Sequence, residues 1–195
     1  MNAHALSRKA DTQPLANDEA QGWISLRPVY LDTETTGLDQ NAEVCEIAVI
    51  NHDGTTLINT LVRPTRAIPP EATNVHGITT QDVADAPVLP EIWDDLLRAI
   101  RGRMVVIYNA DYDVRLLRQS AAAWNMDMPN IFSGCAMKLY ARHRGEWNDS
   151  KGDYQWHTLM NAAKQCRIPI PENLHRAAAD AELTRLLLQH IAREE

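Results

Sequence analysis

Two runs of residues rich in Val, Ile and Thr are joined by a short polar turn. The runs cover residues 43–51 and 55–63, and His52-Asp53-Gly54 lies between them. An Asp-Gly pair between two β-forming runs is a strong hairpin signal, because glycine readily adopts the positive φ that tight turns require. The sequence therefore predicts an antiparallel pair of strands.

Strands and helices alternate along the remaining chain. A short strand is predicted at residues 27–31, and a buried central strand at residues 103–108, where the run is continuously apolar. The Gly-, Asp- and Asn-rich residues 144–154 predict a mobile loop. Strands followed by alternating strands and helices indicate an α/β domain with a mixed sheet. Apolar residues recur every three or four positions in five segments, which predicts helices at residues 89–101, 111–124, 135–143, 156–166 and 176–192.

The chain has 195 residues, which suits one domain with a short extension. Residues 1–24 are polar, include Pro14 and show little periodicity, so a disordered extension is predicted there. The folded domain is predicted at residues 25–195. The alternative for the extension is a docking segment anchored by Trp23 and Ile24.

The overall charge and the cysteines exclude several protein classes. With 19 Lys and Arg against 26 Asp and Glu, the net charge is −7, which argues against a basic protein that coats nucleic acid. The three cysteines are far apart, so neither a disulfide framework nor a zinc site is expected, and a reducing cytoplasm fits. No apolar run approaches about 18 residues, so no membrane span is expected. The N-terminus lacks the apolar region of a secretory signal.

Four acidic residues occupy unusual places relative to the apolar pattern. Asp32 and Glu34 follow the first predicted strand, and a spacing of two puts both on one face of an extended chain. Asp113 and Asp180 each begin a helical row of buried-facing residues. Helix capping and dipole stabilisation would explain one such aspartate well but two less well. The rows consist of Leu116, Leu117, Ser120 and Trp124 after Asp113, and of Leu183, Thr184, Leu187 and Ile191 after Asp180.

If the four acids converge, a cation must neutralise them, because uncompensated buried carboxylates are strongly unfavourable. The apolar rows supply no Lys or Arg at matching positions. Oxygen ligands without cysteine favour Mg²⁺ or Mn²⁺, and four carboxylates suit two divalent ions, as in phosphodiester hydrolysis. His175 is predicted in the loop before the last helix, where it would accept a proton from an attacking water. The alternative is an exposed loop histidine.

Four motifs in this order resemble the DEDDh 3′–5′ exonucleases, the family of the proofreading epsilon subunit of bacterial DNA polymerase III. The family usually has His in place of Tyr108 and Phe in place of Tyr112. The motifs are Leu31-Asp32-Thr33-Glu34-Thr35-Thr36-Gly37-Leu38, Val75-His76-Gly77-Ile78-Thr79, Tyr108-Asn109-Ala110-Asp111-Tyr112-Asp113 and His175-Arg176-Ala177-Ala178-Ala179-Asp180.

The resemblance implies a ribonuclease H-like fold, with a five-stranded mixed sheet flanked by helices. It makes His175 the general base. It also implies two Mg²⁺ ions, for which Mn²⁺ would substitute, held by the catalytic residues Asp32, Glu34, Asp113 and Asp180. The residues that it places around the terminal nucleotide are Thr35, Leu38, Val75, His76 and Tyr112.

The function implied is a cytoplasmic 3′–5′ exonuclease that releases nucleoside 5′-monophosphates from single-stranded DNA or frayed DNA 3′ ends. Trimming of RNA ends is an alternative, because sensing a 2′-hydroxyl depends on pocket geometry. A third hypothesis is an inactive nucleic-acid-binding scaffold, against which the complete set of acids and His175 argues. The chain ends at Glu195 without the tail by which the epsilon subunit binds its polymerase, so stable polymerase association is not expected. A cationic rim for substrate is proposed from Lys138, Arg142, Arg144 and Lys151, with scattered surface charge as the alternative.

Overall fold

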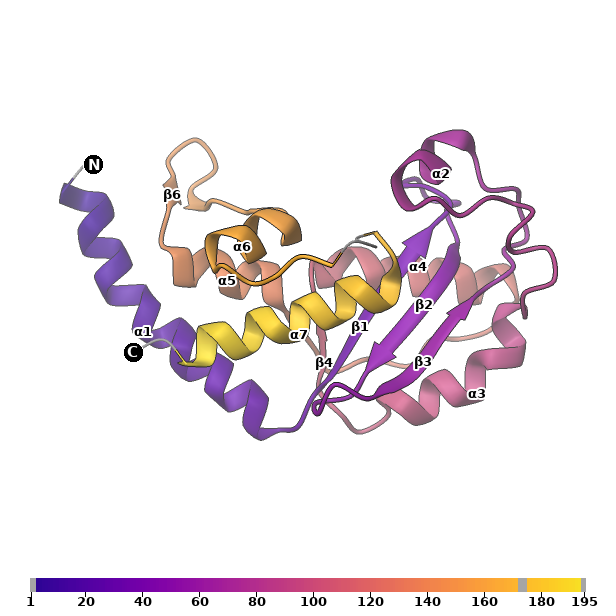
Figure 1. The fold of residues 1–195 in the computed structure, drawn as a ribbon, viewed down its shortest axis with the longest axis horizontal. Helices are drawn as coiled ribbons and strands as arrows, with labels where there is room; N and C mark the ends of the chain where they lie inside the picture. The colour runs from indigo at the N-terminus through magenta and orange to yellow at the C-terminus, as the bar shows by residue number, and fades with distance from the viewer. Residues whose placement is uncertain (1–2, 172–174, 194–195) are drawn as a thin grey trace.

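The central strand of the sheet is β1 (Val29–Thr35), whose two neighbours run in opposite directions. β2 (Val44–Ile50) pairs with it antiparallel, and β4 (Val105–Ile107) pairs with it parallel. β3 (Thr56–Leu61) and β5 (Ser133–Cys135) complete the sheet, in the order β3-β2-β1-β4-β5 (Figure 1). The predicted five-stranded mixed sheet is therefore confirmed.

The computed structural model describes residues 3–171 and 175–193, with side chains from residue 13 onward. Within these ranges, no helix combines the length and the apolar character needed to cross a membrane.

The predicted hairpin is the β2–β3 pair. Asn51 N–H donates to Thr55 O over 2.8 Å, and Gly54 N–H donates to Asn51 O over 2.9 Å. Gly54 has φ 89°, the left-handed region that favours glycine. The Asp-Gly turn predicted from the sequence thus joins β2 to β3, the strand at one edge of the sheet.

Helices cover both faces of the sheet, and neighbouring residues of β1 face opposite ways. Leu31 packs in the cluster formed with α3 (Leu89–Ile100) and α4 (Ala110–Ala123). Tyr30 packs in the cluster that includes residues of α5 (Ala136–Arg144) and α7 (Ala177–Arg193). Because strand side chains alternate, Asp32 and Glu34 share the face of Tyr30, which is the face that α7 covers (Figure 1).

Residues 3–25 form the helix α1 (Ala3–Ser25), which differs from the disordered extension predicted over residues 1–24; residues 1–2 lie outside the described part. Ala16 and Ala20 are 1% and 0% exposed, because α1 packs against α5 and α7. Trp23 and Ile24, the two residues of the docking alternative, are partly buried and pack against the core. The buried residues Ala16 and Ala20 are small and only weakly hydrophobic. The sequence of this segment therefore looks polar, although one face of the helix is buried.

Further elements differ from the sequence expectation. Neither β5 nor α2 (Pro70–His76) was located from the residue pattern. The segment expected to be a mobile loop contains a small hairpin of β6 (Trp147–Asn148) and β7 (Asp153–Tyr154). The rings of Trp147 and Tyr154 meet edge to face across this hairpin, with centroids 5.2 Å apart. α6 (Leu159–Gln165) begins later than predicted, after Thr158 accepts a capping bond from Asn161 N–H.

Candidate active site

Asp32 and Glu34 lie within β1, not after it as the sequence suggested. The strand continues because its pairing with β2 runs on through Glu34 and Glu46 to Thr35 and Val44. A rigid strand therefore holds both carboxylates on one face, two residues apart.

Asp180 joins these two carboxylates from α7. One oxygen each from Asp32, Glu34 and Asp180 lies within 4.8 Å of the others. Asp180 belongs to the first turn of α7, and this turn lies over the face of β1 that carries the other two acids. All three side chains are half-buried. The geometry is that of a compact oxygen-ligand cluster open to solvent on one side.

Asp113 approaches the cluster from the first turn of α4. It is 3% exposed, and its Oδ1 accepts hydrogen bonds from Thr33 N–H (3.1 Å) and Thr33 Oγ1 (2.8 Å). These bonds fix α4 to the middle of β1. Asp113 lies outside the group of three defined above, but its charge contributes to the raised pKa of Asp32.

Removal from water raises the pKa of all four carboxyls. The pKa of Glu34 rises to about 8 and that of Asp113 to about 7, while those of Asp32 and Asp180 rise as well. Burial is the largest cause, and repulsion from neighbouring carboxylates adds to it for Asp32 and Glu34. Within the described residues, no Lys or Arg forms an ion pair with any of the four.

The donor set fits a hard divalent cation. Its ligand atoms are carboxylate oxygens that converge from β1 and α7, and none of these carboxylates forms an ion pair with Lys or Arg in the described part of the chain. Mg²⁺ and Mn²⁺ prefer such oxygen ligands.

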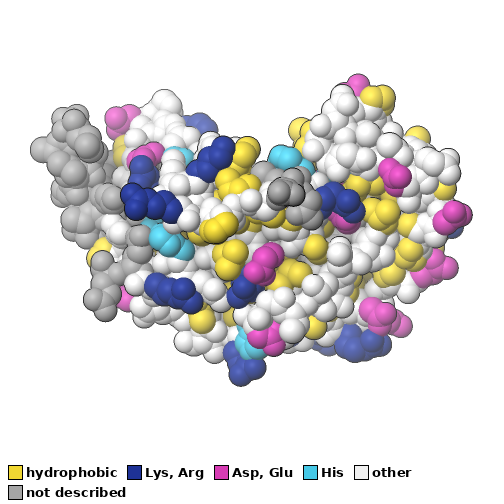
Figure 2. Space-filling model, viewed as in Figure 1, with side chains coloured by type: hydrophobic (Ala, Val, Ile, Leu, Met, Phe, Trp, Pro, Cys, Tyr) yellow, Lys and Arg dark blue, Asp and Glu magenta, His cyan; other side chains and the backbone are white. Residues whose placement is uncertain are grey.

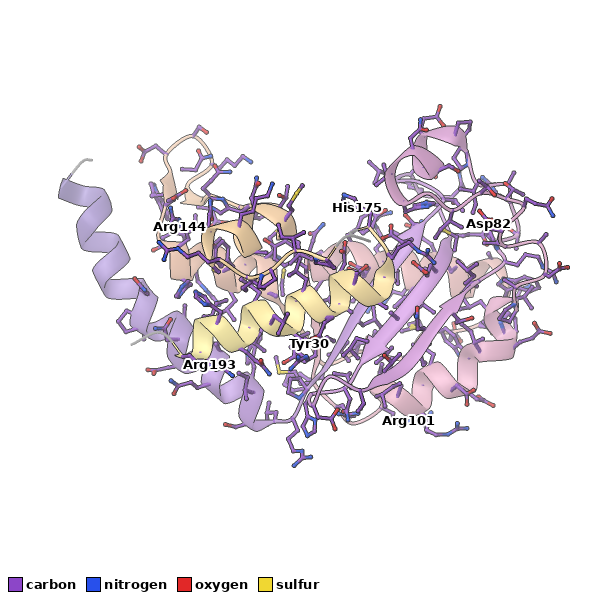
Figure 3. All side chains as sticks on the ribbon, in the orientation of Figure 1. Tyr30, Asp82, Arg101, Arg144, His175 and Arg193 are labelled. Carbon is purple, nitrogen blue, oxygen red and sulfur yellow. The ribbon has the colours of Figure 1, made fainter. Side chains whose placement is uncertain are left out.

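His175 lies in the loop directly before α7, as predicted (Figure 3). Its backbone N–H points to Asp180 Oδ1 at 3.4 Å, and its side chain is exposed. The backbone has φ 65°, which is uncommon for a residue other than glycine. The imidazole is thus held at the edge of the acidic cluster and is accessible to solvent.

Glu46 is a buried acid beside the cluster that the sequence analysis missed. It is 3% exposed, lies opposite Glu34 in the β1–β2 pairing, and forms an ion pair with Arg176. One signal was present in the sequence, since Glu46 is the single charged residue in the otherwise apolar strand Val44–Ile50. A charge in such a strand requires a partner.

A pocket of about 320 Å³ adjoins the acids. Glu34 contributes to its wall, so the pocket and the acidic cluster share a residue. Leu38 and Val75 are 80% and 59% exposed at the pocket. The wall includes every residue that the sequence analysis assigned to the terminal nucleotide, namely Thr35, Leu38, Val75, His76 and Tyr112.

His76 connects the α2 segment to the end of β1. Its Nδ1 accepts a hydrogen bond from Ile78 N–H at 3.0 Å, so in the neutral ring Nε2 carries the proton and donates to Thr35 O at 3.2 Å. Burial lowers the pKa of His76, which favours this neutral form. The imidazole therefore braces one wall of the pocket.

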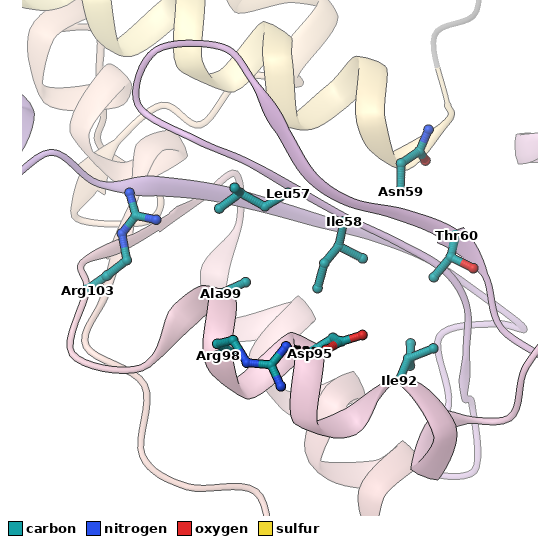
Figure 4. A pocket seen from close by; sticks show the side chains of 9 residues that line it. All are labelled: Leu57, Ile58, Asn59, Thr60, Ile92, Asp95, Arg98, Ala99 and Arg103. Atoms are coloured by element: carbon teal, nitrogen blue, oxygen red, sulfur yellow. Dashed lines mark hydrogen bonds and ion pairs between the residues drawn. The ribbon is translucent and has the colours of Figure 1, made fainter.

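A larger hollow of about 510 Å³ lies elsewhere, between β3 and α3 (Figure 4). Its acid, Asp95, is paired with Arg98. The other residues around it include Leu57, Ile58 and Ile92, and no cluster of acids lines it. His175, which is labelled in Figure 3, lies instead near the notch that the space-filling view shows between the parts carrying β6 and α2 (Figure 2).

The cations proposed as a substrate rim are mostly paired with carboxylates. Lys138 lies 2.6 Å from Asp111, Arg142 lies 2.6 Å from Glu19, and Arg144 lies 2.8 Å from Glu146. Lys151 instead lies 6.0 Å from the ring centroid of Trp156, which is 45% exposed. Of the four, Lys151 is the one without a carboxylate partner in the described residues.

The chain is similar in sequence to known exonucleases. Residues 29–188 match the exonuclease family RNase_T. The uncharacterized exonuclease CP81 of Escherichia phage 186 is 39% identical over 192 residues, which cover 93% of this chain and 96% of the phage protein. The DNA polymerase III epsilon subunit of Escherichia coli is 31% identical over 119 residues, which cover 56% of this chain and 49% of that subunit.

Solved structures show the same architecture. Exonuclease X, in a complex with 5′-overhanging duplex DNA, has a TM-score of 0.62 and 30% identity, over 84% of this chain and 89% of that one. The nuclease domain of 3′hExo, a DEDDh family member, has a TM-score of 0.65 and 13% identity, over 82% and 88% of the two chains. The fold is therefore ribonuclease H-like, and the chain belongs to the RNase_T family of exonucleases, with DEDDh enzymes among its structural relatives.

Proposed function

We propose that this chain is a 3′–5′ exonuclease that hydrolyses single-stranded or frayed DNA 3′ ends to nucleoside 5′-monophosphates. The proposal includes two divalent cations at the acidic cluster, Mg²⁺ with Mn²⁺ as a substitute, and a cytoplasmic setting.

The observation that carries the proposal is the shared position of Glu34. Its carboxylate belongs to the acidic cluster, and the same residue forms part of the wall of the 320 Å³ pocket. A pocket of this size accepts one small ligand. A nucleotide held there would place its 5′ phosphate linkage beside the acids, which fits release of one nucleotide at a time from a chain end.

The pocket wall suits a nucleobase. Leu38 and Val75 provide exposed apolar surface, and Tyr112 adds an aromatic ring. Stacking of a base on an aromatic ring contributes about 1–3 kcal/mol and tolerates any base. Terminal nucleotides would therefore bind without strong sequence preference.

The acids would hold the cations. Asp32, Glu34 and Asp180 converge closely enough to bind the same cation, and the charge of Asp113 acts on Asp32. When bound, the divalent cations would supply the positive charge that activates a water molecule and neutralises the charge developing on the phosphodiester.

His175 would take the proton from the attacking water. Its imidazole lies at the exposed edge of the cluster, where water and substrate have access, and its backbone is bonded to Asp180. A neutral imidazole accepts a proton near neutral pH, so the base role requires the unprotonated ring.

The relatives support DNA as the substrate. Exonuclease X, at 30% identity, is solved with a 5′-overhanging duplex, in which the 3′ end is recessed. The epsilon subunits, which are named as parts of a DNA polymerase, fit DNA as the substrate class for the part of their length that this chain matches.

The test is digestion of matched DNA and RNA oligonucleotides. Each substrate carries a label at the 3′ end or the 5′ end and is offered single-stranded or in a duplex, with Mg²⁺, Mn²⁺ or a chelator. We expect 3′-labelled single-stranded DNA to release a labelled 5′-mononucleotide early in the reaction. This release should require Mg²⁺ or Mn²⁺ and should stop in chelator. Faster digestion of RNA than of DNA would favour RNA trimming over DNA hydrolysis. Early release of the label from 5′-labelled substrates would refute the 3′–5′ direction.

A further inference from the structure

Glu46 has partners that the four cluster acids lack. It faces Glu34 across the β1–β2 pair, and directly opposed residues of antiparallel strands project from the same face. The two carboxylates are thus neighbours, yet of these two only Glu46 forms an ion pair with an arginine, Arg176, among the described residues. This distribution separates Glu46 from the residues that would hold a cation.

The carboxylate of Glu46 is saturated by groups at the start of α7. Arg176 Nε lies 3.0 Å from one carboxylate oxygen and 3.1 Å from the other, and its Nη2 donates as well. Ala177 N–H donates to Glu46 Oε2 over 2.9 Å. The first N–H groups of a helix have no partner within the helix. Here Glu46 of β2 supplies the missing acceptor and caps α7.

These bonds bracket His175. The residue has φ 65°, a conformation that a histidine keeps only when its surroundings hold it. On one side its N–H points to Asp180, and on the other side the next two residues, Arg176 and Ala177, are bound to Glu46. Residues 175–177 are therefore held by hydrogen bonds at both ends.

We propose that the ion pair of Glu46 and Arg176 is a positioning clamp that holds His175 beside the acidic cluster. Glu46 is then a positioning residue that acts through His175 and binds no cation. This inference rests on the proposed nuclease function, because it gives Glu46 its effect through the proposed base.

A double-mutant cycle tests the clamp. Glu46→Gln keeps the size of the side chain and an acceptor for Ala177 N–H but removes the charge that holds Arg176. We expect kcat on 3′-labelled single-stranded DNA to fall about 10- to 100-fold with KM within threefold, as for a displaced catalytic group. In a His175→Ala background the same change should alter kcat by less than twofold. An equal loss in both backgrounds would overturn the clamp.

A matched control and a metal titration complete the test. Glu43 is also 3% exposed, but its carboxylate accepts hydrogen bonds from Thr65 N–H and Oγ1, so Glu43→Gln should leave kcat unchanged. Calorimetric titration with Mn²⁺ should give the same affinity for Glu46→Gln as for the wild type. A tenfold weaker affinity would make Glu46 a metal ligand and overturn its assignment.

A second variant covers failure of Glu46→Gln to fold. Arg176→Lys keeps the positive charge but cannot bond both oxygens as a guanidinium does. It should show the same loss in kcat and the same lack of additivity with His175→Ala. An inactive wild-type protein would refute the nuclease function, whereas an active wild type with unchanged variants would refute only the clamp.

Discussion

The hydroxyl of Tyr112 lies 2.7 Å from the hydroxyl of Thr35, and this contact ties α4 to the end of β1 at the wall of the pocket. Both hydroxyls also lie within hydrogen-bond distance of Gly37 O, at 2.9 Å from Tyr112 and 3.0 Å from Thr35. Each hydroxyl has one proton to donate, so two of these three contacts are hydrogen bonds at any one time.

Two substitutions of Tyr112 distinguish the contribution of its hydroxyl from that of its ring. Tyr112→Phe should lower the free energy of unfolding by about 1 kcal/mol, the net value of one hydrogen bond, and leave kcat near wild type. Tyr112→Ala should raise KM at least tenfold, because it also removes the stacking surface. Denaturant unfolding and steady-state kinetics on a short oligonucleotide measure both effects. Equal KM values for the two variants would exclude stacking on the ring.

Removal of a cluster acid should abolish turnover without unfolding the chain. Asp32→Asn keeps the shape of the side chain and removes one charge from a group of repelling carboxylates. We expect kcat to fall by at least a thousandfold and the melting temperature to stay equal or rise. Gel assays with Mg²⁺ and thermal melts measure the two quantities. Wild-type turnover by this variant would remove Asp32 from the catalytic set.

The sequence predicted those parts of the fold and the site that depend on local patterns. The β2–β3 turn follows from Asp-Gly, and Asp113 and Asp180 stand out because they begin apolar helical rows. The contact of Ala16 and Ala20 with α5 and α7 was not predictable, because small alanines carry little hydrophobic signal and their partners are distant in sequence. The role of Glu46 depends likewise on Arg176, which lies 130 positions later.

Stability without metal should fall as pH rises towards the alkaline side. The pKa of Asp113 is raised from 3.8 to about 7, so the folded state holds this proton more tightly than the unfolded chain does. The stabilisation is complete below about pH 4 and is lost as pH rises through about 7. The pKa of Glu34, raised to about 8, extends the loss upward. Melting temperatures in chelator between pH 5 and 8.5 should therefore decline.

Two comparisons assign this decline to the cluster. Asp113→Asn retains an acceptor for the Thr33 bonds and should show a shallower decline, whereas Asp94→Asn, on the exposed side of α3, should match the wild type. Mg²⁺ should raise the melting temperature more at pH 8 than at pH 5, because it binds the ionised acids. Identical pH profiles for wild type and Asp113→Asn would contradict the assignment.

Lys151 should contribute to binding of DNA more than Arg142 does. Lys151 has no carboxylate partner in the described residues, whereas Arg142 is paired with Glu19. In an inactive Asp32→Asn background, Lys151→Ala should weaken binding of single-stranded DNA and reduce the slope of log K against log salt by about 0.7. Arg142→Gln should change the slope little. Fluorescence anisotropy over a salt series measures both, and equal slopes for all variants would exclude Lys151 from the DNA contact.

The helix α1 should be part of the folded unit in solution. Ala20 is fully buried where α1 packs on α5 and α7, so Ala20→Leu must displace neighbouring side chains and should lower the free energy of unfolding by about 1–3 kcal/mol. Leu15, on the same helix, is 67% exposed, and Leu15→Ala should change stability by less than about 0.5 kcal/mol. Urea unfolding of the two variants distinguishes a docked helix from a loose extension. A wild-type unfolding curve for Ala20→Leu would mean that α1 is detached, since a detached helix tolerates leucine at this position.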